Sequence, residues 1–145
     1  MSKSIGLLLR NGVSAVDAEV KAALAEQGFD EIEPGHHTLL RYLGEDGARP
    51  SELAARAGIT RQAVTKTLND LERVGLVERE PDAADRRGVV VRYTPRGLAA
   101  LQVARTRGKQ LERRFAAHVG AERWRTAREA LEALFDAEGT SQPHR

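Results

Sequence analysis

Two short helical segments separated by a very tight turn are the feature that most limits how this chain can fold. Residues 51–58 (SELAARAG) have a polar start, an apolar centre and a closing Gly58. A single residue separates Gly58 from Thr60, which can cap a second helix with the sequence TRQAVTKTLNDLERVG that Gly75 ends. Two helices joined by so short a glycine-containing turn predict a helix-turn-helix.

The first helix of this pair is expected to begin at Ser51. A serine hydroxyl at this place accepts a hydrogen bond from a free backbone N–H of the first turn. Glu52 then lies near the positive end of the helix, where a carboxylate is favourable. Ser51 is therefore predicted to support the helix-turn-helix.

The second helix has two chemically different sides on a 3.6-residue wheel. One side is mostly apolar and consists of Val64, Thr67, Leu68, Leu71 and Val74. The opposite side carries hydrogen-bonding and basic residues with no acid among them: Gln62, Thr65, Lys66, Asn69 and Arg73. Asp70 and Glu72 point to the flanks. We expect the apolar side to face a core and the other side to face solvent or a ligand.

A β-hairpin is predicted directly after this helix. The sequence LVERE forms a short strand, and residues 81–88 (PDAADRRG) are rich in turn-forming residues. VVVRYT is the returning strand, in which Val89, Val91 and Tyr93 lie on one face. Thr94 and Pro95 then begin another helix.

Apolar stripes at helical spacing predict long helices on both sides of this centre. Residues 5–27 form one amphipathic helix, and Pro34 begins a shorter second helix. The chain after Thr94 contains two more helices, followed by a frayed tail, EGTSQPHR. The order of these predicted helices and strands indicates a mainly α fold with a small β-hairpin wing, that is, a winged helix-turn-helix between terminal helices. The predicted domains are residues 1–33 (dimerisation helix), 34–94 (winged helix-turn-helix) and 95–145 (dimerisation helices and tail), because the terminal stripes exceed what the centre can cover.

Composition excludes several classes of function. The chain has 145 residues and no cysteine, so disulfides, thiol redox sensing and cysteine-ligated zinc are ruled out. No apolar run approaches the roughly 20 residues of a membrane span, and the N-terminus is a poor signal peptide, so we expect a cytoplasmic protein without membrane contact. No catalytic constellation or phosphate-binding loop is visible, which argues against an enzyme and against a cofactor. The net charge of +2 says little about partners, but a basic segment over residues 86–114 can bind a polyanion or form a solvated helix face.

The outer side of the second helix has the chemistry that DNA recognition needs. Lysine can donate to guanine O6 or N7, Gln62 and Asn69 can pair with adenine, and Thr65 can contact a thymine methyl or a phosphate. The candidate recognition residues are Thr60, Arg61, Gln62, Thr65, Lys66, Asn69 and Arg73. The alternative is that they only keep an ordinary helix soluble.

The loop of the hairpin supplies a second candidate contact. Arg86 and Arg87 can enter a minor groove, whose narrow A·T-rich stretches have an enhanced negative potential. Asp85 is expected to orient one arginine through a carboxylate–guanidinium pair. An ordinary polar turn is the alternative interpretation.

Residues 51–97 resemble the winged helix of the MarR (multiple antibiotic resistance regulator) family. The matching pieces are Glu52-Leu53-Ala54, Val64-Thr65-Lys66, Leu71-Glu72, Gly75-Leu76-Val77 with Arg79, Asp85-Arg86-Arg87, and Tyr93-Thr94 with Gly97. Lys66 stands where the family commonly has a base-contacting arginine, so the charge is kept but the bidentate fork is lost. Tyr93 stands where leucine is usual.

The resemblance implies a homodimeric transcriptional regulator, a repressor, that binds double-stranded DNA at an inverted-repeat operator. Its two recognition helices would lie about one helical turn apart, roughly 34 Å. The alternative is a winged-helix scaffold for protein interaction or dimerisation that does not bind DNA.

The resemblance also implies a small-molecule effector near the start of the second helix. His36 and His37 can line such a pocket, although a histidine at a helix start more often contacts the neighbouring subunit or an ordinary polar partner. His118 and His144 make no recognised metal-ligand spacing with the pair, so no metal site is predicted.

Overall fold

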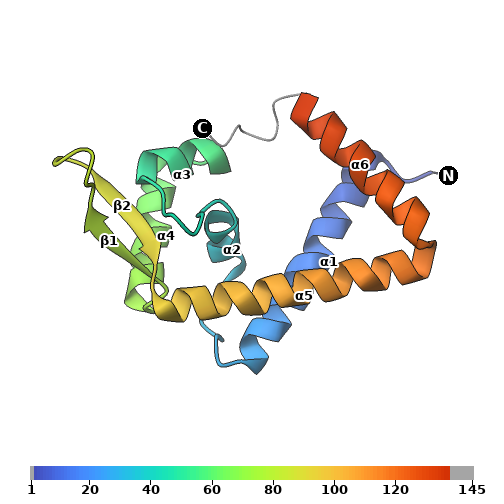
Figure 1. Ribbon diagram of the computed structural model, residues 1–145, viewed down its shortest axis with the longest axis horizontal. Helices are drawn as coiled ribbons and strands as arrows, with labels where there is room; N and C mark the ends of the chain where they lie inside the picture. The colour runs from blue at the N-terminus through green and yellow to red at the C-terminus, as the bar shows by residue number, and fades with distance from the viewer. Residues whose placement is uncertain (1, 138–145) are drawn as a thin grey trace. The chain divides into compact units, whose positions relative to one another are not determined.

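The computed structural model describes residues 2–137 and divides into two compact units, one up to Arg107 and one from Gly108 onward. The predicted frayed tail and His144 lie outside the described residues. The elements, in order, are α1 (Ile5–Glu26), α2 (Pro34–Leu40), α3 (Pro50–Ala57), α4 (Arg61–Arg73), β1 (Val77–Pro81), β2 (Val89–Tyr93), α5 (Pro95–Val119) and α6 (Ala121–Ala137) (Figure 1). The predicted fold class, mainly helical with one hairpin, is confirmed.

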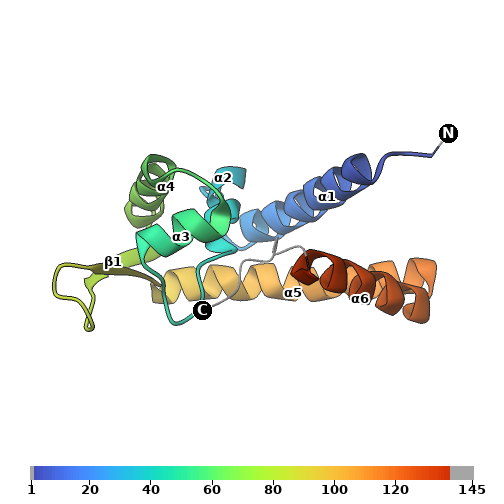
Figure 2. The same cartoon turned by 90° about the horizontal axis from the view of Figure 1, so that it is seen from above.

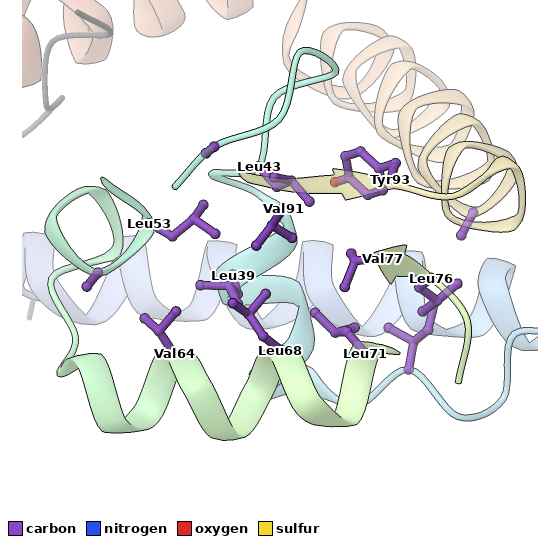
Figure 3. Packing of buried hydrophobic residues seen from close by; sticks show 14 of the residues in the cluster. Leu39, Leu43, Leu53, Val64, Leu68, Leu71, Leu76, Val77, Val91 and Tyr93 are labelled. Atoms are coloured by element: carbon purple, nitrogen blue, oxygen red, sulfur yellow. The ribbon is translucent and has the colours of Figure 1, made fainter. Parts of the chain in front are cut away.

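The core of the first unit forms where α4 packs against α2, α3 and β1, while β2 packs against α3. Val64, Leu68 and Leu71 of α4 are fully buried, as the helical wheel predicted. Figure 3 shows them pointing toward Leu39 of α2 and Val91 of β2. Burial of these aliphatic side chains fixes which side of α4 remains outside, since a helix can turn only one stripe inward.

The hairpin pairs antiparallel, with Val77 opposite Tyr93 and Pro81 opposite Val89. Pro81 is therefore the last residue of the first strand. The sequence analysis had placed it in the loop, so that prediction is wrong. In the segment before α3, Ala48 bridges Val91 through two backbone hydrogen bonds of 3.0 and 2.9 Å. This bridge joins the hairpin to the chain segment that leads into α3.

The first helix is buried only toward its C-terminal end. Val20 and Leu24 belong to the core, whereas Val13 of the same stripe is 51% exposed. Ile5, Leu7 and Leu8 are also exposed large apolar residues. The N-terminal part of α1 therefore leaves several large apolar side chains uncovered.

The second unit contains the end of α5 and α6. Phe115 and Trp124 pack with ring centroids 5.2 Å apart, and Arg128 forms ion pairs with Glu112 and Glu132. Leu131 and Leu134 of α6 are exposed. None of the helices within residues 2–137 is long and apolar enough to cross a membrane.

The start of α5 lies very close to the backbone of Leu76, directly before the hairpin. The Thr94 hydroxyl donates to the Gly75 carbonyl at 2.6 Å and accepts from the Gly97 N–H at 3.0 Å, so Thr94 caps the helix as predicted. A Cβ at position 97 would overlap the carbonyl oxygen of Leu76. Only glycine allows α5 to approach the backbone here.

Candidate nucleic-acid interface

The turn between α3 and α4 has the geometry of a helix-turn-helix. Gly58 adopts a left-handed conformation with φ of 64°, which ends α3. The Thr60 hydroxyl then accepts from the Ala63 N–H at 3.1 Å and caps α4. The predicted cap at Ser51 is wrong: α3 begins at Pro50, Arg49 is the N-cap, and Ser51 is exposed in the first turn. Proline suits the first helical position because its missing N–H needs no partner there.

The predicted recognition residues of α4 all point away from the core. Thr60, Arg61, Gln62, Thr65, Lys66, Asn69 and Arg73 are exposed. The Thr65 hydroxyl donates to the Arg61 carbonyl at 2.9 Å, so its oxygen can still accept a hydrogen bond from an external donor. Within residues 2–137 the side chains of Gln62 and Lys66 form no hydrogen bond or ion pair. Both are therefore available to an external ligand.

Arg79 matches the family pattern but was not predicted as a site residue, and it contacts this same surface. Its guanidinium donates to Asn69 Oδ1 at 3.0 Å and pairs with Glu72 through its other terminal nitrogen. Asn69 is thus the one predicted base-contacting amide whose oxygen is already engaged within the described chain.

The loop of the wing projects beyond α3 and α4, as Figures 1 and 2 both show. Arg86 and Arg87 are exposed at its tip, and neither guanidinium has a partner among the described residues. Asp85 was expected to pair with one of them, but its Oδ1 instead accepts from the Arg87 backbone N–H at 3.0 Å. Asp85 therefore shapes the loop backbone, because a short acidic side chain can bond to the amide two residues on.

The base of the wing is held by an ion pair between residues 33 positions apart. Arg49 Nε donates to Asp82 Oδ2 at 2.6 Å, and Asp82 Oδ1 accepts from the Ala84 N–H at 2.9 Å. The Ala84 N–H and the Arg49 guanidinium hold the pKa of Asp82 below its usual value. The sequence carries no local signal for this pair. It connects the N-terminus of α3 to the wing and so links the helix-turn-helix to the hairpin.

The two predicted effector-pocket histidines have different surroundings. His36 Nδ1 accepts from the Glu33 N–H at 3.0 Å, which is the ordinary helix-start partner that sequence analysis kept as the alternative. His37 has a buried Nε2 with no hydrogen-bond partner among the described residues, and burial lowers its pKa. Within residues 2–137 no three His, Asp or Glu side chains are grouped so that they can hold a metal ion.

A helix-turn-helix with an acid-free exposed face, followed by a hairpin with two unpaired arginines, defines a winged helix-turn-helix protein. The model of the MarR family matches residues 31–88. The HTH-type transcriptional repressor Rv2887 of Mycobacterium tuberculosis is 30% identical over 131 residues, which cover 90% of this chain and 92% of that protein. The chain belongs to the MarR family of transcriptional regulators, which are not enzymes.

A second relative matches over a shorter part. A transcriptional regulatory protein for the hcr operon of Thauera aromatica is 29% identical over 103 residues. The match covers 70% of this chain, which spans 60% of that relative's length.

Solved structures share the fold at lower sequence identity. FabT of Streptococcus pneumoniae in complex with DNA has a TM-score of 0.76 and 23% identity, with 94% of this chain and 96% of that chain covered. Apo MarR from E. coli has a TM-score of 0.70 and 23% identity, with 92% and 98% covered. The arrangement of helices and hairpin is therefore one that these regulators adopt.

Proposed function

We propose that the protein is a repressor that binds double-stranded DNA in a sequence-specific manner. The observation that carries the proposal is the exposed face of α4, which presents Gln62 and Lys66 without an internal partner, while the flanking acids Asp70 and Glu72 are paired with Arg73 and Arg79. An α-helix with such a face fits the major groove, where amide and ammonium groups can contact base edges. The FabT structure was determined with DNA, which supports this use of the fold.

The wing supplies the second contact in this proposal. Arg86 and Arg87 enter the minor groove beside the recognition helix, and Asp85 fixes the backbone from which they extend. The proposed interface comprises Thr60, Arg61, Gln62, Thr65, Lys66, Asn69 and Arg73 of the recognition helix and both wing arginines.

The protein acts as a homodimer in this proposal. Ile5, Leu8 and Val13 of α1 are exposed, and Leu134 of α6 is 49% exposed. Exposed apolar residues on several helices favour a protein–protein interface, and a second copy of the chain would bury them. Two copies related by a two-fold axis match an inverted-repeat operator, with residues 1–33 and 95–145 as dimerisation regions and 34–94 as the DNA-binding domain.

A small-molecule effector that releases the DNA completes the proposal. The buried, unpartnered Nε2 of His37 is a polar atom that such a ligand can satisfy, and His36 lies beside it. Binding to operator DNA places the protein in the cytoplasm.

Selection of bound duplexes from a random pool tests this function directly. We expect the selected sequences to contain an inverted repeat, and binding to fall linearly with salt on a log–log plot, because basic side chains displace counterions from DNA. Absence of binding to every duplex, including the chain's own promoter, would favour a winged-helix scaffold for protein interaction.

A further inference from the structure

The side-chain amide of Asn69 has a defined orientation in the DNA-free chain. It lies on the exposed face of α4, and the atom that faces Arg79 on β1 is 3.0 Å from the guanidinium. A guanidinium only donates hydrogen bonds, so the facing atom of the amide is its oxygen. The NH2 group of Asn69 is therefore the part left for an external partner.

The arginine that sets this orientation is itself anchored. Its second terminal nitrogen pairs with Glu72, which lies one helical turn after Asn69 on α4. Arg79 also belongs to a strand position paired with the buried Val91. The side chains of Arg79 and Glu72 are 28% and 31% exposed, so solvent screens the pair and it adds little stability. Its consequence is geometric, because it holds the guanidinium where Asn69 can meet it.

This orientation changes what Asn69 can recognise. Pairing with adenine uses both ends of the amide, since the oxygen accepts from N6 and the NH2 group donates to N7. The hydrogen bond from Arg79 occupies one lone pair of the oxygen and turns this oxygen toward β1, so the NH2 group is the end turned away from β1. Guanine presents two acceptors, O6 and N7, to such a donor in the major groove. We propose that Arg79 is a positioning residue that makes Asn69 select guanine instead of the adenine expected from the sequence. This inference rests on the proposed DNA-binding function.

The experiment uses the full-length chain and duplexes selected from a random pool. Asn69→Ala first identifies the base pair whose preference disappears, and binding is then measured for all four base pairs at that position. We expect the wild-type chain to prefer guanine over adenine there by on the order of tenfold. Arg79→Met frees the amide to rotate, so the guanine-to-adenine ratio should fall at least about fivefold. In the Asn69→Ala background, Arg79→Met should leave the ratio unchanged, since Arg79 acts through Asn69.

Arg92→Met is the matched control. Arg92 lies on the neighbouring strand and pairs with Glu80 at 3.0 Å, so its loss removes the same charge without touching Asn69. Overall affinity should fall while the ratio stays constant. If Arg79→Met does not fold by circular dichroism, Arg79→Lys, which keeps the charge but lacks the planar fork, should lower the same ratio.

The inference would be overturned by a wild-type preference for adenine, by an unchanged ratio in the folded Arg79 variant, or by an equal change in Arg92→Met. Loss of binding that is uniform over all base pairs in Asn69→Ala would also overturn it, because Asn69 would then contact phosphate. Failure of the wild-type chain to bind any duplex would overturn the proposed function itself. It differs from the results above, in all of which the wild-type chain binds DNA.

Discussion

Replacing Gly97 by alanine tests how the wing and recognition helix are joined to α5. In an open helical position this change stabilises a protein by up to about 1 kcal/mol, because alanine favours the helix. At Gly97 the added Cβ would overlap the Leu76 carbonyl oxygen and lie 2.9 Å from Tyr93 Cδ1. Backbone atoms cannot rotate away as the end of a flexible side chain can, so the start of α5 must shift.

The expected cost follows from these contacts. Overpacking costs about 1–3 kcal/mol. A shift of α5 also weakens the Thr94 hydrogen bonds to Gly75 and Gly97, each worth about 1 kcal/mol. After the gain in helix propensity, we expect Gly97→Ala to lower the free energy of unfolding by about 2 kcal/mol or more.

Urea denaturation followed by circular dichroism, at one fixed protein concentration, measures this difference. Gly12→Ala is the control, because nothing lies within 4 Å of the position its Cβ would occupy, and it should be neutral or stabilising. A Gly97→Ala variant as stable as the wild type would refute the close approach of α5 to Leu76.

Three further predictions concern the interface and its surroundings. Lys66→Ala should relax sequence preference at one position per half-site by about 1–3 kcal/mol, measured by selection of bound duplexes; an unchanged preference profile would remove Lys66 from the base-contacting residues. Arg87→Ala should weaken binding mainly to sites with A·T-rich flanks in a titration of matched duplexes, whereas an equal loss on all flanks would mean a phosphate contact. The pKa of His37 should lie below 6.5, because burial disfavours its charged form. Since the unfolded chain then binds more protons, His37 should reduce stability as the pH falls below about 6.5, and a pKa at or above that value by NMR titration would contradict this.

Local patterns in the sequence were sufficient for the elements and for the outer face of α4. Helix periodicity depends on residues three and four apart, so Val64, Leu68 and Leu71 define the inner stripe without knowledge of the rest of the fold. The Thr60 and Thr94 caps are equally local, because each hydroxyl bonds to an amide three residues on. The same locality explains why the hairpin and its exposed loop could be predicted.

The cap of α3 shows where local signals compete. Ser51 is a good capping residue, but Pro50 cannot lie inside a helix and is well suited to begin one. The helix therefore begins at Pro50, and Arg49 becomes the cap.

Contacts between distant residues were decided by the tertiary structure alone. Arg49 meets Asp82, Ala48 meets Val91 and Arg79 meets Asn69 only after the helix-turn-helix and the hairpin have packed on one core. No periodicity encodes such pairs, because each depends on the direction in which two separate elements cross. The sequence by itself therefore determined which side chains of α4 face away from the core, whereas the packing of β1 against α4 decided that the oxygen of the Asn69 amide is turned toward Arg79.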